Sequence, residues 1–187
     1  MEKLLKDGRL FKLLEKIDSD MAAEAAAEGC DHCGEETLHR GDYRRKPRGG
    51  PQWDKRHSFC CAKEGCRKRK TPASVRFLGR KVYVGVVIVL VSAMIHGLKP
   101  KRVDVLREAL GIDKRTVERW RAWWLENFAG SRFWKQARAF FMPRLDETVL
   151  PLSLVDAFQA KRRAGMARLL EFISPITVPA RKGAAAM

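Results

Sequence analysis

The sequence has few acidic residues for its size, and it lacks the motifs on which many enzymes depend. Its 187 residues include 22 Asp and Glu against 38 Lys and Arg, a formal charge of +16. It contains no glycine-rich phosphate loop, no nucleophile elbow and no paired carboxylate motif. We therefore expect no enzyme and no small-molecule substrate. The partner that this charge favours is a polyanion, nucleic acid first and an anionic membrane surface second.

A long apolar run is also missing. The uncharged stretch at residues 82–95 covers 14 positions, whereas a membrane-spanning helix needs about 20 apolar residues. We expect a core helix there, with a membrane-associated segment at residues 82–98 as the alternative. The N-terminus begins with a charged amphipathic stretch instead of an apolar signal core. We therefore expect a cytoplasmic protein associated with the nucleoid.

No cysteine follows position 66, and all five lie within one segment, at Cys30, Cys33, Cys60, Cys61 and Cys66. In a chain that is not exported, clustered cysteines bind a metal more often than they form disulfides. Cys30-Asp31-His32-Cys33-Gly34 has the spacing of a zinc knuckle, and the partner cysteines lie about 27 residues further on.

The third ligand is either Cys60 or Cys61, which point to opposite faces if they lie on a strand. We favour Cys61, because it leaves four residues before Cys66. Four thiolates leave no open coordination position, so the metal is expected to be structural Zn²⁺. The predicted ligands are Cys30, Cys33, Cys61 and Cys66, with His39 and His57 in reserve.

Basic residues crowd the same part of the chain, where residues 37–70 hold twelve basic and three acidic groups. Such a surface either tracks phosphates or is simply solvated. We favour phosphate contacts, for which the candidates are Arg44, Arg45, Lys46, Arg48, Arg67, Lys68, Arg69 and Lys70.

A helix-turn-helix is predicted further on, with helices at residues 101–110 and 114–128. Gly111 supplies the turn, Ile112 plugs it, and Asp113 can cap the second helix. At 100° per residue, one face of that helix holds Val117, Trp120, Trp124 and Phe128. The opposite face suits the major groove, and the candidate DNA contacts are Lys114, Arg115, Thr116, Glu118, Arg119 and Ala122. A structural or protein-binding helical hairpin is the alternative.

These features predict a mainly α protein with a small β zinc ribbon. The expected units are an N-terminal helical segment (1–28), the zinc ribbon (29–72), a trihelical helix-turn-helix domain (80–130), C-terminal helices (131–173) and a disordered tail (174–187). The trihelical domain would use residues 82–96 as its first helix. Within the C-terminal part, Ser131 is expected to cap a helix through Phe141, and the helices at 152–172 are expected to break near Gly165.

Four segments together carry a family resemblance: Gly29-Cys30-Asp31-His32-Cys33-Gly34, Arg45-Lys46-Pro47-Arg48-Gly49, Cys61 with Cys66-Arg67, and Arg115-Thr116-Val117-Glu118-Arg119-Trp120. The chain resembles, over about residues 29–128, the zinc-ribbon plus helix-turn-helix proteins of bacterial insertion sequences, which are transposases or transposase-associated. The resemblance implies mobile-element DNA as the target, the four cysteines as zinc ligands and residues 114–122 as the reading helix.

Full transposases of this kind add an RNase H-like domain with three carboxylates, for which the residues after 128 leave no room. We therefore expect a non-catalytic accessory factor or regulator that binds double-stranded DNA. The alternative is an assembly subunit that binds a separate transposase or a second copy of itself. Its Trp-rich helix and C-terminal helices would then be the contact, with Trp123 and Trp134 as the exposed aromatic candidates, although we favour core burial for each of them.

Overall fold

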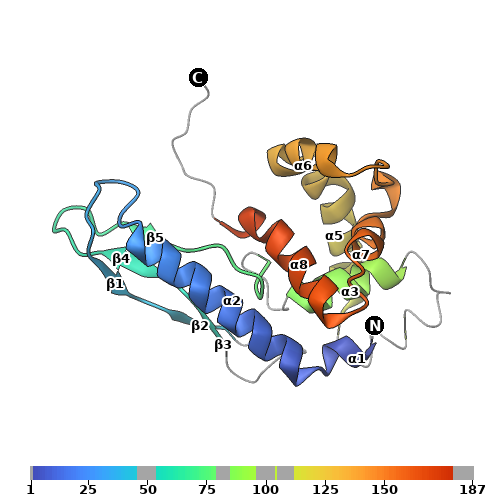
Figure 1. Ribbon diagram of the computed structural model, residues 1–187, viewed down its shortest axis with the longest axis horizontal. Helices are drawn as coiled ribbons and strands as arrows, with labels where there is room; N and C mark the ends of the chain where they lie inside the picture. Colours follow the sequence, from blue (N-terminus) through green and yellow to red (C-terminus); the bar gives the residue numbers. More distant parts are fainter. Residues whose placement is uncertain (1, 46–53, 79–84, 96–103, 105–111, 179–187) are drawn as a thin grey trace.

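The computed structural model describes residues 2–45, 54–78, 85–95, 104 and 112–178. Short strands lie toward one end of the molecule and most of the helices toward the other, with the long helix α2 between them (Figure 1). We refer to the strands and the loops that join them as the sheet end, and to the helices after residue 84 as the helical end. The predicted class, mainly helical with a small antiparallel sheet, is confirmed.

Two helices open the chain, α1 (Glu2–Leu5) and α2 (Gly8–Ala27). The Asp7 carboxylate starts α2 by accepting hydrogen bonds from the backbone N–H groups of Arg9 (3.0 Å) and Leu10 (3.3 Å). Gly29, with φ at +72°, follows its end. The N-terminal helical segment expected at residues 1–28 thus consists of the short helix α1 and one long helix from residue 8. Its buried stripe is Leu10, Leu14, Asp18, Ala22 and Ala25.

Five short strands follow: β1 (Leu38–Arg40), β2 (Tyr43–Arg45), β3 (Asp54–Arg56), β4 (Phe59–Cys61) and β5 (Arg69–Lys70). The antiparallel order in one sheet is β1-β4-β5, and β2 pairs with β3 separately. Leu38 lies opposite Cys61, and Phe59 lies opposite Lys70. Strands of two or three residues bury little apolar surface, so this sheet needs support from elsewhere.

The helical end contains α3 (Gly85–Ile95), α5 (Lys114–Ala122), the π-helix η1 (Trp123–Phe128), α6 (Arg132–Ala137), η2 (Arg138–Phe140), η3 (Glu147–Val149), α7 (Leu152–Ala157), α8 (Arg163–Ile173) and η4 (Ser174–Thr177). Its centre is α3, where every residue from Val86 to Val91 is at most 2% exposed. α3 packs against α5, α7 and α8, which confirms the expected core helix over the part described. Within the described ranges, no helix has both the length and the apolar character needed to cross a bilayer.

One buried cluster joins three of the predicted units. It includes Leu10 and Leu14 of α2, the whole inner run of α3, Trp124 of η1, and Leu154 and Leu169 of the last helices. The N-terminal helix, the region predicted as helix-turn-helix and the C-terminal helices therefore share a core, because none of their apolar faces is large enough to be buried alone.

Two local expectations at the C-terminal side are corrected. The helix capped by Ser131 ends at Ala137, and the chain continues as the 3-10 turn η2. The break between the last helices falls at residues 158–162, and Gly165 lies inside α8. A Cβ at Gly165 would stand 2.3 Å from the carbonyl oxygens of Phe158 and Gln159, so this glycine permits close packing of the turn instead of breaking the helix.

Part of the predicted disordered tail is folded. Residues 174–177 form η4, Ser174 and Thr177 are buried, and the Thr177 hydroxyl accepts a hydrogen bond from the backbone N–H of Ser74 (2.9 Å). Residues 179–187 lie outside the described residues.

Only the second half of the predicted helix-turn-helix can be compared with the structure. Of the first helix and the turn, residues 101–111, the described ranges include Asp104 alone, which is helical. Ile112 is 2% exposed, and the Asp113 carboxylate accepts a hydrogen bond from the backbone N–H of Arg115 (2.7 Å). Asp113 thus caps α5 as predicted.

A buried polar cluster ties α2 to the sheet end and to the segment that leads on to α3. Asp18 of α2 is fully buried and accepts hydrogen bonds from the Ser74 hydroxyl (2.7 Å), the backbone N–H of Val75 (2.7 Å) and Nε of Arg76 (2.8 Å). Nη2 of Arg76 also donates to the carbonyl oxygen of Lys55 in β3 (2.9 Å). This carboxylate therefore fixes the segment that leads from the strands to α3.

Candidate metal centre and nucleic-acid surface

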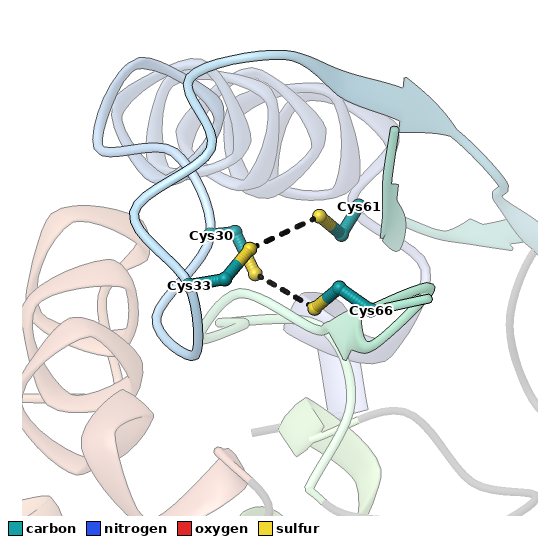
Figure 2. A group of neighbouring side chains, drawn as sticks. All are labelled: Cys30, Cys33, Cys61 and Cys66. Carbon is teal, nitrogen blue, oxygen red and sulfur yellow. Dashed lines mark hydrogen bonds between the residues drawn. The ribbon is translucent and has the colours of Figure 1, made fainter. Parts of the chain in front are cut away.

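The four cysteines predicted to bind zinc lie together at the sheet end (Figure 2). All four Sγ atoms are within 4.8 Å of one another; Sγ of Cys30 lies 3.8 Å from that of Cys66, and Sγ of Cys33 lies 3.6 Å from that of Cys61. All four are free thiols. Zinc–sulfur bonds of about 2.3 Å at tetrahedral angles need sulfur atoms about 3.8 Å apart. The spacing and the donor set thus fit one soft, four-coordinate metal ion.

Two tight turns present these thiols in pairs. In the first, the backbone N–H of Cys30 donates to the Glu35 carbonyl (2.7 Å) and that of Gly34 to the Cys30 carbonyl (3.0 Å). In the second, the backbone N–H of Cys66 donates to the Lys63 carbonyl (3.1 Å). Gly34 (φ +72°) and Gly65 (φ +84°) take the left-handed conformation that such turns require. Pairing of β1 with β4 brings one turn to the other.

The four thiols differ in how readily they ionise. Hydrogen bonding from the backbone N–H of His32 lowers the pKa of Cys30 to about 7. Burial, together with hydrogen bonds to the neighbouring thiols, raises the pKa of Cys61 to about 12. Four thiolates at this distance repel one another, so a bound cation is needed to hold all of them deprotonated.

The remaining cysteine and both reserve histidines lie apart from this group. Cys60 is half-buried on the other face of β4, where its thiol lies 3.4 Å from the Arg67 carbonyl. His39 is exposed on β1. His57 is buried, and its Nδ1 contacts the side chains of Arg40 (3.0 Å) and Asp42 (3.4 Å). Of the two neighbouring cysteines, Cys61 is the one that joins the thiol cluster.

The basic residues proposed as phosphate contacts fall into different environments. Arg44, Arg67 and Lys68 are exposed. Arg69 is exposed too, but its guanidinium donates to the Gly41 carbonyl (3.2 Å) and the Ser58 hydroxyl (3.1 Å). For the remaining candidates, Arg45, Lys46 and Arg48, the side chains lie outside the described part of the structure.

Lys70 is corrected from a phosphate contact to a structural ion-pair partner. Its side chain is 12% exposed, and its ammonium lies 2.8 Å from the Glu28 carboxylate and 2.9 Å from that of Asp31. Because two carboxylates neutralise it, Lys70 is not free to bind a phosphate. It holds the first cysteine turn against the end of α2 instead.

α5 and η1 separate apolar from charged residues as predicted. The exposed fractions of Val117, Trp120, Trp124 and Phe128 are 7%, 2%, 0% and 1%. On the outer side, Lys114, Arg115, Glu118 and Arg119 are exposed, and Thr116 and Ala122 are half-buried. Nη2 of Arg119 donates to the Thr116 hydroxyl (2.9 Å), which orients this guanidinium. Arg121, which periodicity places on the flank, is exposed as well.

The two tryptophans considered as exposed partner contacts differ in burial. Trp134 is fully buried, with its ring centroid 5.2 Å from that of Phe128. Trp123 is half-buried and packs edge-on against Trp124 (4.9 Å). Trp134 therefore cannot serve as a surface contact, whereas Trp123 is partly accessible.

Comparisons of the chain with protein-family models, with curated proteins and with solved structures return no match. The class of protein is therefore defined by fold and site alone. It is a mainly helical protein with a four-cysteine candidate metal centre at one end and an exposed cationic helix, α5, in its helical part.

Proposed function

We propose that this chain binds duplex DNA, with a structural zinc ion holding the sheet end and α5 lying in the major groove. The observation that carries the proposal is the outer side of α5. Three exposed cations, Lys114, Arg115 and Arg119, lie there beside a single acid, Glu118. Within the described part of the chain, none of the three forms an ion pair, so their charge is available to phosphates and base edges.

The architecture of α5 favours a groove-binding helix over a merely solvated surface. Its inner side is clamped by Trp120 and by Trp124 of η1, both buried, so the helix is held rigidly while its outer side stays exposed. Rigid presentation matters because an arginine fork must meet the O6 and N7 acceptors of guanine in one geometry. The hydrogen bond to Thr116 already constrains Arg119 in this way.

We propose that the sheet end contributes binding that does not depend on the DNA sequence. Arg67 follows Cys66 directly, and Arg67 and Lys68 are exposed. A metal at the thiol cluster would fix the backbone from which both side chains leave. We assign them to phosphate contacts, which set register and affinity without reading sequence.

The resemblance to zinc-ribbon plus helix-turn-helix proteins extends the proposal to a biological setting. We infer that the target is the DNA of a mobile genetic element and that the chain acts as a non-catalytic accessory factor or regulator beside a separate transposase. Support for this step is the sequence resemblance of residues 29–128 alone, and the setting is tested by co-purification with the transposase of a neighbouring gene.

Replacing Arg119 with alanine is expected to reduce sequence preference. The test uses a duplex selected from a random pool by the wild-type chain, together with a scrambled duplex of the same length. Loss of one bidentate base contact should cost about 1–3 kcal/mol on the selected duplex, roughly 5- to 150-fold in Kd, and much less on the scrambled one. Fluorescence anisotropy titrations at fixed salt measure both constants.

Arg121→Ala is the matched control, because it removes the same charge from the same helix. Two residues further along, Arg121 points about 160° away from Arg119 around the helix axis. We expect Arg121→Ala to weaken binding to both duplexes to the same small extent. Equal losses on the two duplexes for Arg119→Ala would show that α5 does not read sequence.

Replacing Arg67 and Lys68 together with alanine is expected to weaken binding to every duplex alike. Each lost phosphate contact should lower the slope of log K against log salt by about 1. Lys12→Ala, which removes an exposed charge from the acidic N-terminal segment, is the control and should leave the slope unchanged. A salt slope in the double variant equal to that of the wild type would remove the sheet end from the interface.

A further inference from the structure

Two large apolar side chains of the helical end are almost fully exposed to solvent. Phe140 is 86% exposed and Met142 is 88% exposed. In the described ranges the next large hydrophobic residue in exposure is Val178, at 47%. Phe140 ends η2, and Met142 lies two residues further on. We call this pair the apolar tip.

The loop that carries the apolar tip is anchored at two points. Between the two tip residues, Phe141 turns inward, and its ring centroid lies 5.6 Å from that of Phe172 and 5.9 Å from that of Trp134. Before the tip, Arg138 pairs with Glu147 of η3 (2.9 Å). The inward anchor leaves its two neighbours facing solvent, so the exposure of the tip follows from how the loop is built.

The chain segment that carries the apolar tip is rich in cations, and Asp146 and Asp156 line the same surface hollow as Phe140 and Met142. Residues 130–145 contain no acidic residue. They contain four exposed cations, namely Arg132, Lys135, Arg138 and Arg144. Apart from Arg138, which pairs with Glu147, none of these forms an ion pair with another described residue. An apolar tip with this rim is complementary to a polyanion that also offers flat apolar faces, and the base steps of duplex DNA have both properties.

The size of the patch argues for DNA over a protein partner. Two large side chains expose roughly 300–400 Å² at most, whereas one side of a stable protein interface covers about 800 Å². A wedge that unstacks one base step needs only one or two side chains, and Phe and Met are both residues that proteins use in this way.

We infer that the apolar tip inserts between adjacent base pairs of the bound duplex and kinks it. This inference rests on the proposed DNA binding and names a contact outside α5 and the thiol cluster. The cations at positions 132, 135 and 144 would neutralise phosphates next to the opened step. Bending of the duplex toward the helical end would then allow more of the cationic surface to touch it.

The experiment places the fluorescent base analogue 2-aminopurine at successive positions of the selected duplex. The fluorescence of 2-aminopurine rises where it loses its stacking on neighbouring bases. The duplex ends are also labelled for energy transfer, which reports the end-to-end distance. The wild-type chain should raise the fluorescence at one step and shorten the end-to-end distance. A Phe140→Ala, Met142→Ala double variant should lose both signals and bind roughly 10- to 100-fold more weakly. Phe140→Leu keeps an apolar side chain and should retain the fluorescence signal.

Val178→Ala is the matched control for loss of an exposed apolar side chain elsewhere, and it should change neither signal. Because the tip residues are exposed, the double variant should unfold at the wild-type temperature. If the wild-type chain binds the duplex but the fluorescence of 2-aminopurine does not rise at any position, insertion of the apolar tip is refuted, while the proposed DNA binding is not. If light scattering shows a wild-type dimer that the double variant cannot form, with duplex bending unchanged, the tip is a protein contact. If the wild type binds no duplex at all, the proposed function itself fails.

Discussion

A Cys61→Ser variant is expected to lose its metal and to unfold at the sheet end, whereas Cys60→Ser keeps both metal and fold. The Cys61 side chain is fully buried, and its Sγ lies 3.6 Å from that of Cys33. A serine hydroxyl is protonated near neutral pH and is a harder ligand than a thiolate, so it would leave three sulfurs around a soft ion. Cys60 is the next residue on the same strand, but its thiol lies outside the cluster.

The effect of losing the metal should be large because little else supports the sheet. The strands contain two or three residues each, and beside the cysteines β4 contributes one large buried side chain, Phe59. Structural zinc supplies about 10–16 kcal/mol of apparent folding free energy in small cysteine-rich domains near neutral pH. That is comparable with the whole stability of an ordinary domain, about 5–15 kcal/mol.

Three measurements on reduced protein test this expectation: metal content per chain, the thiolate-to-cobalt absorption of the Co²⁺-loaded chain, and thermal unfolding with and without a chelator. Wild type and Cys60→Ser should each hold one ion and show the same cobalt spectrum. The metal assignment is refuted if Cys61→Ser keeps a full complement of metal, or if chelator leaves the thermal unfolding of the wild type unchanged.

Features that depend on local spacing could be predicted from the sequence. The 3.6-residue period of α5 separated its buried residues from its exposed arginines, and an aspartate directly before it is a cap signal. Alternation along β4 predicted that only one of Cys60 and Cys61 reaches the metal, and the four residues between Cys61 and Cys66 favoured Cys61. In each case the deciding neighbour lies within a few positions along the chain.

Features that depend on distant partners could not be predicted. Lys70 resembles the other cations around it, and its role is set by Glu28, 42 positions earlier. Asp18 and Asp20 lie on the same helix and have the same side chain, yet Asp20 is exposed and Asp18 is buried. The partners of Asp18 are Ser74, Val75 and Arg76, which lie 56 to 58 positions further along the chain. Gly165 was expected to be a helix breaker, but the fold uses it where two carbonyl oxygens leave no room for a Cβ.

Asp18→Asn is expected to destabilise the whole chain while leaving the thiol cluster intact. The carboxylate is fully buried and accepts three hydrogen bonds, one of them from the Arg76 guanidinium. Removing its charge breaks the buried ion pair with Arg76, which costs about 3–5 kcal/mol. For a protein of this size the loss corresponds to a fall in Tm of roughly 6–20 °C. Thermal and denaturant unfolding at saturating zinc measure it, because metal loss then cannot contribute.

Asp20→Asn provides the matched control, since it makes the same change two residues away at an exposed position of α2 and should shift stability by no more than about 0.5 kcal/mol. A double-mutant cycle between Asp18→Ala and Arg76→Ala then isolates the pair itself. The two changes should cost less together than the sum of their separate costs, because the first already breaks the ion pair, with a coupling of about 0.5–3 kcal/mol. Strictly additive costs, or an Asp18→Asn variant as stable as Asp20→Asn, would mean that the sheet end is joined to the helices by apolar packing and not through this carboxylate.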